Sequence, residues 1–146
     1  MFSIAVYGLA VSSNFVCAKL ADTQWLEQSF QPSSYKETLK HLFKGVRLIK
    51  SKRIKFSRLP RVAENGSIVP ITVASSLKNV NKISILVKKN PIPLIAEFHL
   101  SPAVEARVSA RFKMAKTSDV IAIIEADGKF YFKSKKVVVA VGGCGS

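Results

Sequence analysis

From about residue 52 onward, apolar and polar residues alternate along much of the chain. The clearest stretch covers residues 104–114, where apolar residues occupy the even-numbered positions and polar residues the odd-numbered ones. One face of this stretch would carry Val104, Ala106, Val108, Ala110, Phe112 and Met114, and the other Glu105, Arg107, Ser109, Arg111 and Lys113. Successive side chains of a β-strand point to opposite faces of its sheet. The pattern therefore predicts one long strand with an apolar face in a core and a polar face in water.

Shorter segments of the same kind recur before and after this stretch. They lie at residues 54–56, 69–73, 83–87, 120–124, 130–132 and 137–141, and turn signals separate them at 64–66, 90–91, 101–102 and 127–128. Asp127-Gly128 is a typical hairpin turn, and Pro70 predicts an edge position or a bulge in its strand. Seven or eight such strands predict a mainly-β, immunoglobulin-like antiparallel β-sandwich over residues 52–141.

A helical segment precedes the strands. Ser34 and Glu37 have the spacing of a capping box, in which the side chain of each residue accepts a hydrogen bond from the backbone N–H of the other. Three apolar residues then share one helical face, namely Leu39, Leu42 and Phe43, and Gly45 supplies a stop signal. We expect residues 19–51 to form a short N-terminal helical arm packed on the sandwich.

Residues 1–18 contain no charged side chain and are mostly apolar. The stretch is short for a membrane span, and Val16 and Ala18 match the −3 and −1 positions of a signal-peptidase site. This pattern predicts a signal peptide and an exported protein, with a buried N-terminal strand or helix as the alternative. The positive segment that usually opens a signal peptide is missing, which leaves the export route open.

Removal of residues 1–18 would also remove Cys17 and leave Cys144 as the one cysteine. An unpaired cysteine in an exported protein indicates an intermolecular bridge or a free reactive thiol. Cys144 follows the last predicted strand directly and has glycine on both sides, at Gly142, Gly143 and Gly145. Because glycine samples both halves of the φ range, we predict that residues 142–146 form a flexible carrier arm.

This arm would present the thiol of Cys144 to other proteins. Extended residues span roughly 3.3–3.6 Å each, so the sulfur would reach on the order of 10 Å beyond the last strand. Positive surroundings favour the reactive thiolate, and the nearest candidates in the sequence are Lys133, Lys135 and Lys136. The pattern predicts a thiol at Cys144 that is presented to several enzymes in turn.

No metal or cofactor site is expected. His41 and His99 are the two histidines, and neither has the spacing of metal ligands relative to Cys144. Each histidine is interpreted as a surface or hydrogen-bonded residue.

The formal net charge of +14 comes entirely from residues after Ala18. Such a charge attracts anions, including nucleic acid, anionic lipid, acidic protein surfaces and small oxyanions. The densest basic stretch, residues 44–61, contains no helix-turn-helix, finger or RNA-binding signature. A solvated basic face is therefore favoured, and a nucleic-acid or lipid-surface binder is an alternative that we do not adopt.

Several blocks of the chain resemble a known family. They are Arg61-Val-Ala-Glu-Asn-Gly-Ser-Ile-Val-Pro-Ile-Thr-Val73, Asn90-Pro-Ile-Pro-Leu-Ile-Ala-Glu-Phe-His-Leu100, Arg111, residues 120–122, Asp127-Gly128 and the ending Val141-Gly-Gly-Cys-Gly145. Over about residues 35–145 the chain resembles SoxY, the sulfur-carrier protein of the bacterial thiosulfate-oxidation (Sox) system. The position of Gly-Gly-Cys-Gly at the end of the chain, together with the internal blocks, makes the match specific.

The resemblance implies an immunoglobulin-like sandwich that forms a heterodimer with a second small sandwich protein, SoxZ. It also implies that Cys144 carries sulfur intermediates covalently. A c-type haem enzyme would join the cysteine to thiosulfate, and a thiosulfohydrolase would then release sulfate. A sulfane dehydrogenase is a further implied partner, and the haem and metals belong to the partners.

The sequence departs from the family at both ends. Many members end in Gly-Gly-Cys-Gly-Gly, whereas this chain ends in Ser146, and residues 1–18 lack the arginines of the twin-arginine leader that the family commonly uses. The alternative function is a periplasmic β-sandwich that binds or chaperones other proteins, with an incidental exposed thiol at Cys144.

Overall fold

The computed structural model describes residues 27–141. Helix α2 (Tyr35–Phe43) precedes nine strands. These are β1 (Leu48–Lys50), β2 (Ile54–Ser57), β3 (Val62–Asn65), β4 (Val69–Ser75), β5 (Val80–Val87), β6 (Leu94–His99), β7 (Arg107–Phe112), β8 (Ser118–Ala126) and β9 (Lys129–Val141). Among the described residues, no helix has the length and apolar character needed to cross a membrane.

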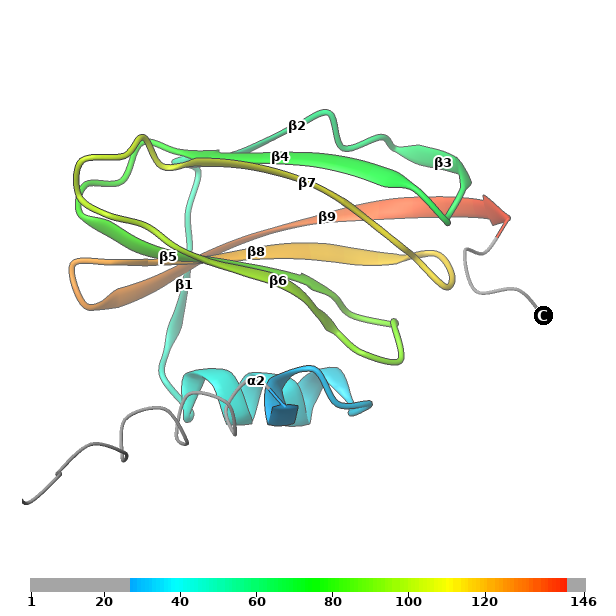
Figure 1. The fold of residues 1–146 in the computed structure, drawn as a ribbon, viewed down its shortest axis with the longest axis horizontal. Helices are drawn as coiled ribbons and strands as arrows, with labels where there is room; N and C mark the ends of the chain where they lie inside the picture. Colours follow the sequence, from blue (N-terminus) through cyan, green and yellow to red (C-terminus); the bar gives the residue numbers. More distant parts are fainter. Residues whose placement is uncertain (1–26, 142–146) are drawn as a thin grey trace, which may run out of the picture.

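The strands form two sheets that face each other across one core (Figure 1). The larger sheet has the order β1-β9-β8-β5-β6, with β3 also paired to β9, and the smaller has the order β2-β4-β7. Inward-facing residues of both sheets fill the space between them, including Ile54, Ile71, Val73, Ile83, Ile85 and Ile124. The mainly-β sandwich predicted from the alternating pattern is confirmed.

Strand β9 is longer than the sequence pattern suggests. The apolar segments 130–132 and 137–141 predict separate strands, but both belong to one strand of 13 residues. Strand β8 pairs with β9 from Lys129 to Val137 without a break. The polar residues in the middle stay in the strand because the aliphatic stems of lysines can cross the edge of the sandwich while their charged ends find partners.

Two short strands pair with β9 in parallel, which an antiparallel sandwich does not include. Leu48 of β1 pairs with Phe130, and Val62 of β3 pairs with Val138. Strand β1 lies within residues 19–51, where the sequence predicts only a helical arm, and β3 includes two residues predicted as part of a turn. Neither segment has an alternating pattern long enough to predict a strand. Each is extended because it pairs with β9, which is distant in the sequence.

Strand β7 is shorter than the alternation at 104–114 predicts. It covers Arg107–Phe112, and Val104 lies in a preceding turn where its side chain is 57% exposed. Local bonds form this turn, since the N–H of Val104 donates to Ser101 O over 3.0 Å. The inward pattern nevertheless holds at Val108, Phe112 and Met114, which are all buried.

Pro70 lies in β4, the middle strand of the smaller sheet. Its neighbour β2 ends opposite Thr72, at the pair Ser57↔Thr72, so Pro70 pairs only with Arg111 of β7. The missing N–H of proline is tolerated at a sheet edge. The strand therefore has a local edge at Pro70, as the sequence predicts.

The capping box predicted for α2 is present. The N–H of Glu37 donates to Ser34 Oγ over 3.2 Å, and the N–H of Ser34 donates to Glu37 Oε2 over 2.9 Å. The helix ends at Phe43, and Lys44 takes the left-handed cap position (φ 45°) just before Gly45 (φ 77°). The stop signal at Gly45 therefore acts one residue earlier, through Lys44.

Helix α2 covers the outer face of the larger sheet (Figure 1). The ring of Phe43 meets the ring of Phe130 in β9 edge to face, with centroids 5.5 Å apart. Phe43 belongs to a second apolar cluster with Leu86, Leu94, Ile121 and Ile123. The helical arm therefore packs on the sandwich, as the sequence analysis expects.

Candidate functional site at the end of strand β9

The predicted carrier residue Cys144 and its glycines Gly142, Gly143 and Gly145 lie outside the described residues. The last residue that the structure describes is Val141, at the end of β9 and directly before Gly142. The N–H of Gly66 donates to Val141 O over 2.8 Å, and the N–H of Val138 donates to Arg61 O over 2.9 Å. Because Ala63 of β3 also pairs with Val139, β9 is held in the sheet up to the residue before the first glycine.

Apolar side chains are exposed around this end of β9. Val62 and Val138 are direct partners in the ladder, so their side chains lie on the same face, and they are 56% and 43% exposed. Val141 and Ile68 are 65% and 67% exposed. Val141 faces the side of β9 opposite to Val138, so Val62 and Val138 are the adjacent exposed apolar pair here, of the kind found where one protein binds another.

The structure gives a different role to two of the lysines suggested as neighbours of the thiol. Lys133 Nζ donates to Ile54 O over 2.8 Å, and Lys135 Nζ donates to Leu59 O over 2.6 Å. Both side chains therefore cross from β9 to the backbone of the segment that contains β2. Lys136 is exposed.

Comparison with known proteins decides the family. The model of the SoxY family, described as sulfur oxidation protein SoxY, matches residues 39–144. The chain belongs to the SoxY family. The match includes Cys144 and confirms the resemblance seen in the sequence.

A solved SoxY structure agrees with this assignment. The sulfur carrier protein SoxY from Chlorobium limicola f thiosulfatophilum is 34% identical, with a TM-score of 0.67, and the match covers 79% of this chain and 99% of that chain. Two structures of superoxide reductase (neelaredoxin) from Ignicoccus hospitalis share the fold alone. One is a single-substitution variant, at 12% identity and TM-score 0.55, covering 67% of this chain and 97% of that chain. The other is 14% identical with a TM-score of 0.53, covering 59% and 79%. A search of curated proteins finds no match to this chain.

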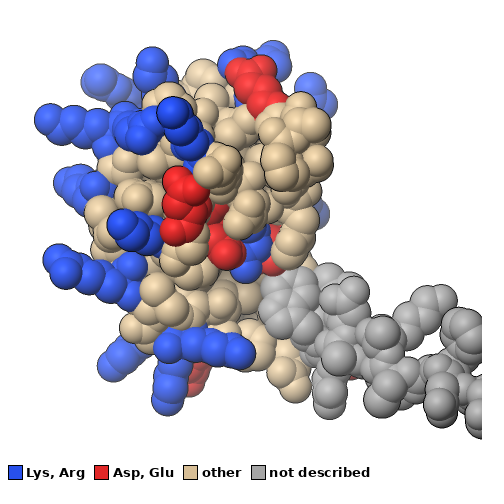
Figure 2. Space-filling model, turned by 90° about the vertical axis from the view of Figure 1, so that its left-hand side faces the viewer, with Lys and Arg blue, Asp and Glu red and all other residues tan. Residues whose placement is uncertain are grey.

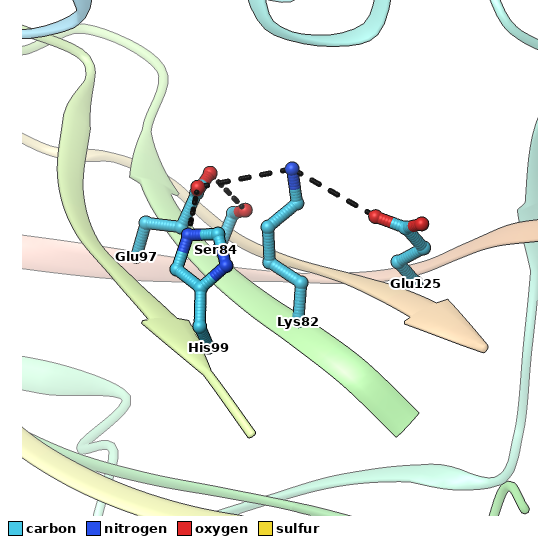
Figure 3. A network of polar contacts seen from close by, with 5 residues as sticks. All are labelled: Lys82, Ser84, Glu97, His99 and Glu125. Atoms are coloured by element: carbon cyan, nitrogen blue, oxygen red, sulfur yellow. Dashed lines mark hydrogen bonds and ion pairs between the residues drawn. The ribbon is translucent and has the colours of Figure 1, made fainter. Parts of the chain in front are cut away.

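Glu97 is the centre of a polar network in this SoxY-family chain (Figure 3). Its side chain is 4% exposed and lies 3.7 Å from Lys82 Nζ, which also approaches Glu125 at 3.8 Å. His99 Nε2 lies 2.9 Å from Glu97 Oε1, and Ser84 Oγ donates to Glu97 Oε2 over 3.0 Å. The network links β5, β6 and β8 and satisfies a nearly buried carboxylate, which is a structural role.

This arrangement agrees with reading His99 as a hydrogen-bonded residue. Within residues 27–141, no group of three or more His, Cys, Asp or Glu side chains converges as a metal site would require.

The basic residues are unevenly distributed over the surface. Figure 2 shows Lys and Arg gathered along one side of the face it presents, with acidic side chains nearer its centre. All three ion pairs formed among residues 27–141 belong to the Glu97 network. Most of the positive charge of the described region is therefore not neutralised by ion pairs within it.

The smaller sheet carries a hollow that the sequence does not predict. Its volume is about 710 Å³, and it is lined by Arg58, Ile68, Pro70, Ile71, Thr72, Ser109, Ala110 and Arg111. The alternating pattern places Ser109 and Arg111 on the outward face of their strand, which is a usable signal. The hollow itself was not predictable, because Arg58 and Ile68 reach it from loops.

Proposed function

We propose that this protein is a covalent carrier of sulfur intermediates, bound to Cys144, in thiosulfate oxidation. The observation that carries the proposal is the family match, because it extends from residue 39 through Cys144. The solved relative from Chlorobium is itself a sulfur carrier protein. Strand β9 supports the proposal further, because its pairing with β3 continues to Val141 and Cys144 follows three residues later.

The chemistry belongs to the thiol of Cys144 and to partner enzymes. In the first step, the thiolate and thiosulfate form a sulfur–sulfur bond, and the electron pair released passes to a c-type haem enzyme. In the second step, a thiosulfohydrolase uses water to release sulfate and protons, which leaves a persulfide on Cys144. The persulfide sulfur is then either oxidised further by a sulfane dehydrogenase, which takes up the electrons, or passed to storage as elemental sulfur. This chain catalyses none of these steps.

The proposal includes a heterodimer with a SoxZ-type partner subunit. Val62 and Val138 offer an apolar surface beside the point from which the carrier segment continues. A partner bound there would lie close to the cargo on Cys144. The predicted signal peptide at residues 1–18 supports a periplasmic location, where the partners would act on the same pool of thiosulfate.

Intact-mass spectrometry of the protein from thiosulfate-grown cells tests the carrier role. We expect a sulfur-containing adduct that maps to the C-terminal peptide and that a reductant removes, because disulfide and thiosulfonate bonds are reducible. Cys144→Ser should abolish the adduct and thiosulfate oxidation, while the fold stays intact. Ser146→Ala, two residues further along the same segment, is the matched control and should keep both.

A different result would favour the alternative function. If Cys144→Ser still supports thiosulfate oxidation, the thiol is not the carrier group. The protein would then be a periplasmic sandwich that binds or chaperones other proteins, with an incidental thiol.

A further inference from the structure

The hollow on the smaller sheet has the chemistry of an anion site. Arg58 and Arg111 line it together with the hydroxyl residues Thr72 and Ser109, and no acidic residue is among the described residues of its lining. Because every ion pair among residues 27–141 lies in the Glu97 network, neither arginine is neutralised by a carboxylate there. Arginine forms paired, charge-assisted hydrogen bonds with oxyanions.

The hydroxyl pair leaves one donor available. Thr72 Oγ1 and Ser109 Oγ are 2.8 Å apart, and one of them donates to the other. Each hydroxyl has a single hydrogen, so one hydrogen remains once this bond is made. Thr72 is only 1% exposed, whereas Ser109 is exposed, so Thr72 lies at the floor of the hollow and Ser109 on its open side.

The backbone also points to Arg58. This residue has a φ of 59°, which is uncommon for residues other than glycine, asparagine and aspartate. Such a conformation is strained and is found where function or packing requires it. Arg58 directly follows Ser57, the last residue of β2, and its position after the strand is one that lines the hollow.

The hollow is also within covalent reach of Cys144. Ile68, at its edge, comes two residues after Gly66, whose N–H binds Val141 O. Consecutive Cα atoms are about 3.80 Å apart, so the segment from Val141 to Cys144 spans at most about 11 Å. A group carried on Cys144 could therefore reach the edge of the hollow without any change in the sandwich.

From these observations we propose that the hollow binds a tetrahedral sulfur oxyanion through Arg58, Arg111 and the Thr72–Ser109 hydroxyl pair. The choice of sulfur among the oxyanions rests on the proposed function. The ligand group is a sulfonate-type SO₃ or sulfate head, and it has two sources. It is either a free ion such as thiosulfate or the terminal sulfonate of a thiosulfate joined to Cys144.

The test starts with the Cys144→Ser protein, in which no covalent loading can occur. Thiosulfate is titrated into it, and the arginine side-chain N–H signals are followed by nitrogen NMR. We expect saturable shifts at Arg58 and Arg111, and about a tenfold weaker affinity after Arg58→Gln or Arg111→Gln, because each removes a charge-assisted contact. Arg107→Gln is the matched control, since Arg107 lies in the same strand but does not line the hollow.

If all three arginine substitutions weaken thiosulfate binding equally, the effect is one of net charge and the site is refuted. The same holds if no saturable shift occurs at either lining arginine. Because this experiment needs no adduct on Cys144, it stands apart from the test of the carrier role.

A second experiment distinguishes the two sources. Tetrathionate loads the wild-type protein: the thiolate attacks an inner sulfur, a cysteine–sulfur bond forms, and thiosulfate leaves. If the loaded protein binds free thiosulfate more weakly than Cys144→Ser does, and Arg58→Gln removes this difference, the tethered sulfonate occupies the site. Equal affinities mean that the site takes the free ion. Either result is consistent with the oxyanion site.

Discussion

The ammonium group of Lys133 in β9 donates a hydrogen bond to the backbone carbonyl of Ile54 over 2.8 Å. This contact joins the larger sheet to β2 of the smaller one along the edge of the sandwich. A basic residue that the sequence suggested as a neighbour of the Cys144 thiol therefore has a structural partner. The same holds for Lys135, which binds the carbonyl of Leu59.

Replacing Lys133 with methionine should destabilise the protein. The aliphatic stem would remain, but the carbonyl of Ile54 would lose a charged donor, which costs about 1–2 kcal/mol. Urea unfolding measures the difference. Lys136→Met is the control, because Lys136 is exposed in the same strand. Equal losses for the two variants would show that the bond to Ile54 contributes nothing specific.

Phe43→Ala should detach helix α2 from the larger sheet. Phe43 is 3% exposed and packs edge to face on Phe130, and loss of a buried aromatic side chain costs about 3 kcal/mol or more. The free energy of unfolding should fall by this amount, whereas His41→Ala, an exposed position of the same helix, should change it little. A small effect of Phe43→Ala would mean that the helix contributes little to the fold.

Glu37 should titrate below its ordinary range. The backbone N–H of Ser34 and then its hydroxyl hold the pKa of the Glu37 carboxyl below 4.5, because both bonds favour the ionised form. Its contribution to the helix is therefore present above pH 4.5 and is lost as the pH falls through the lowered pKa. Carboxyl-carbon NMR should show this directly.

Ser34→Ala should raise the pKa of Glu37 toward 4.5, since it removes the hydroxyl while leaving the backbone bond. Ser33→Ala is the control, because the Ser33 hydroxyl binds Thr38 instead. An unchanged titration after Ser34→Ala would contradict the capping-box origin of the shift.

Glu97→Gln should cost more stability than Glu125→Gln. The Glu97 carboxylate has three polar neighbours and a 4% exposed side chain, whereas Glu125 approaches only Lys82 and is 27% exposed. Removing a nearly buried charge leaves Lys82 with Glu125 alone and takes the charged acceptor away from Ser84 and His99, at a cost of about 2 kcal/mol. Thermal unfolding of the two variants compares them, and a reversed order would rule out Glu97 as the centre of the network.

The double variant Val62→Ser, Val138→Ser should weaken binding of the proposed SoxZ-type partner without unfolding the chain. Both side chains are exposed, so their loss removes apolar contact area mainly from a complex. Co-purification of the two subunits measures the effect. Val104→Ser, equally exposed in the connection before β7, is the control and should leave the complex intact.

Much of the sandwich was predictable because its strands have local signatures. The alternation around Val108 and Phe112 predicts which side chains face the core, and Asp127-Gly128 forms a turn between β8 and β9 with both residues at positive φ. The capping box at Ser34 was equally local. Each of these depends on residues within one strand, turn or helical turn.

The errors arose where pairing partners are distant in the sequence. Val62–Asn65 becomes a strand because β9 offers it a parallel edge more than seventy residues later. Lysines in the middle of β9 suggested a break between two strands, but the carbonyls of Ile54 in β2 and of Leu59 just after β2 accept hydrogen bonds from their ammonium groups. No local pattern contains this information.

By itself, the sequence determined the mainly-β core, the capped helix and the placement of one glycine-flanked cysteine three residues beyond the last strand. Their physical causes are local: side-chain alternation, capping geometry and the conformational range of glycine. Only the tertiary structure decided that β3 pairs with β9 as far as Val141, and that Arg58 and Arg111 meet across one hollow. Those arrangements depend on which distant segments pack together, because the free energy of burying shared surface, rather than any local preference, selects them.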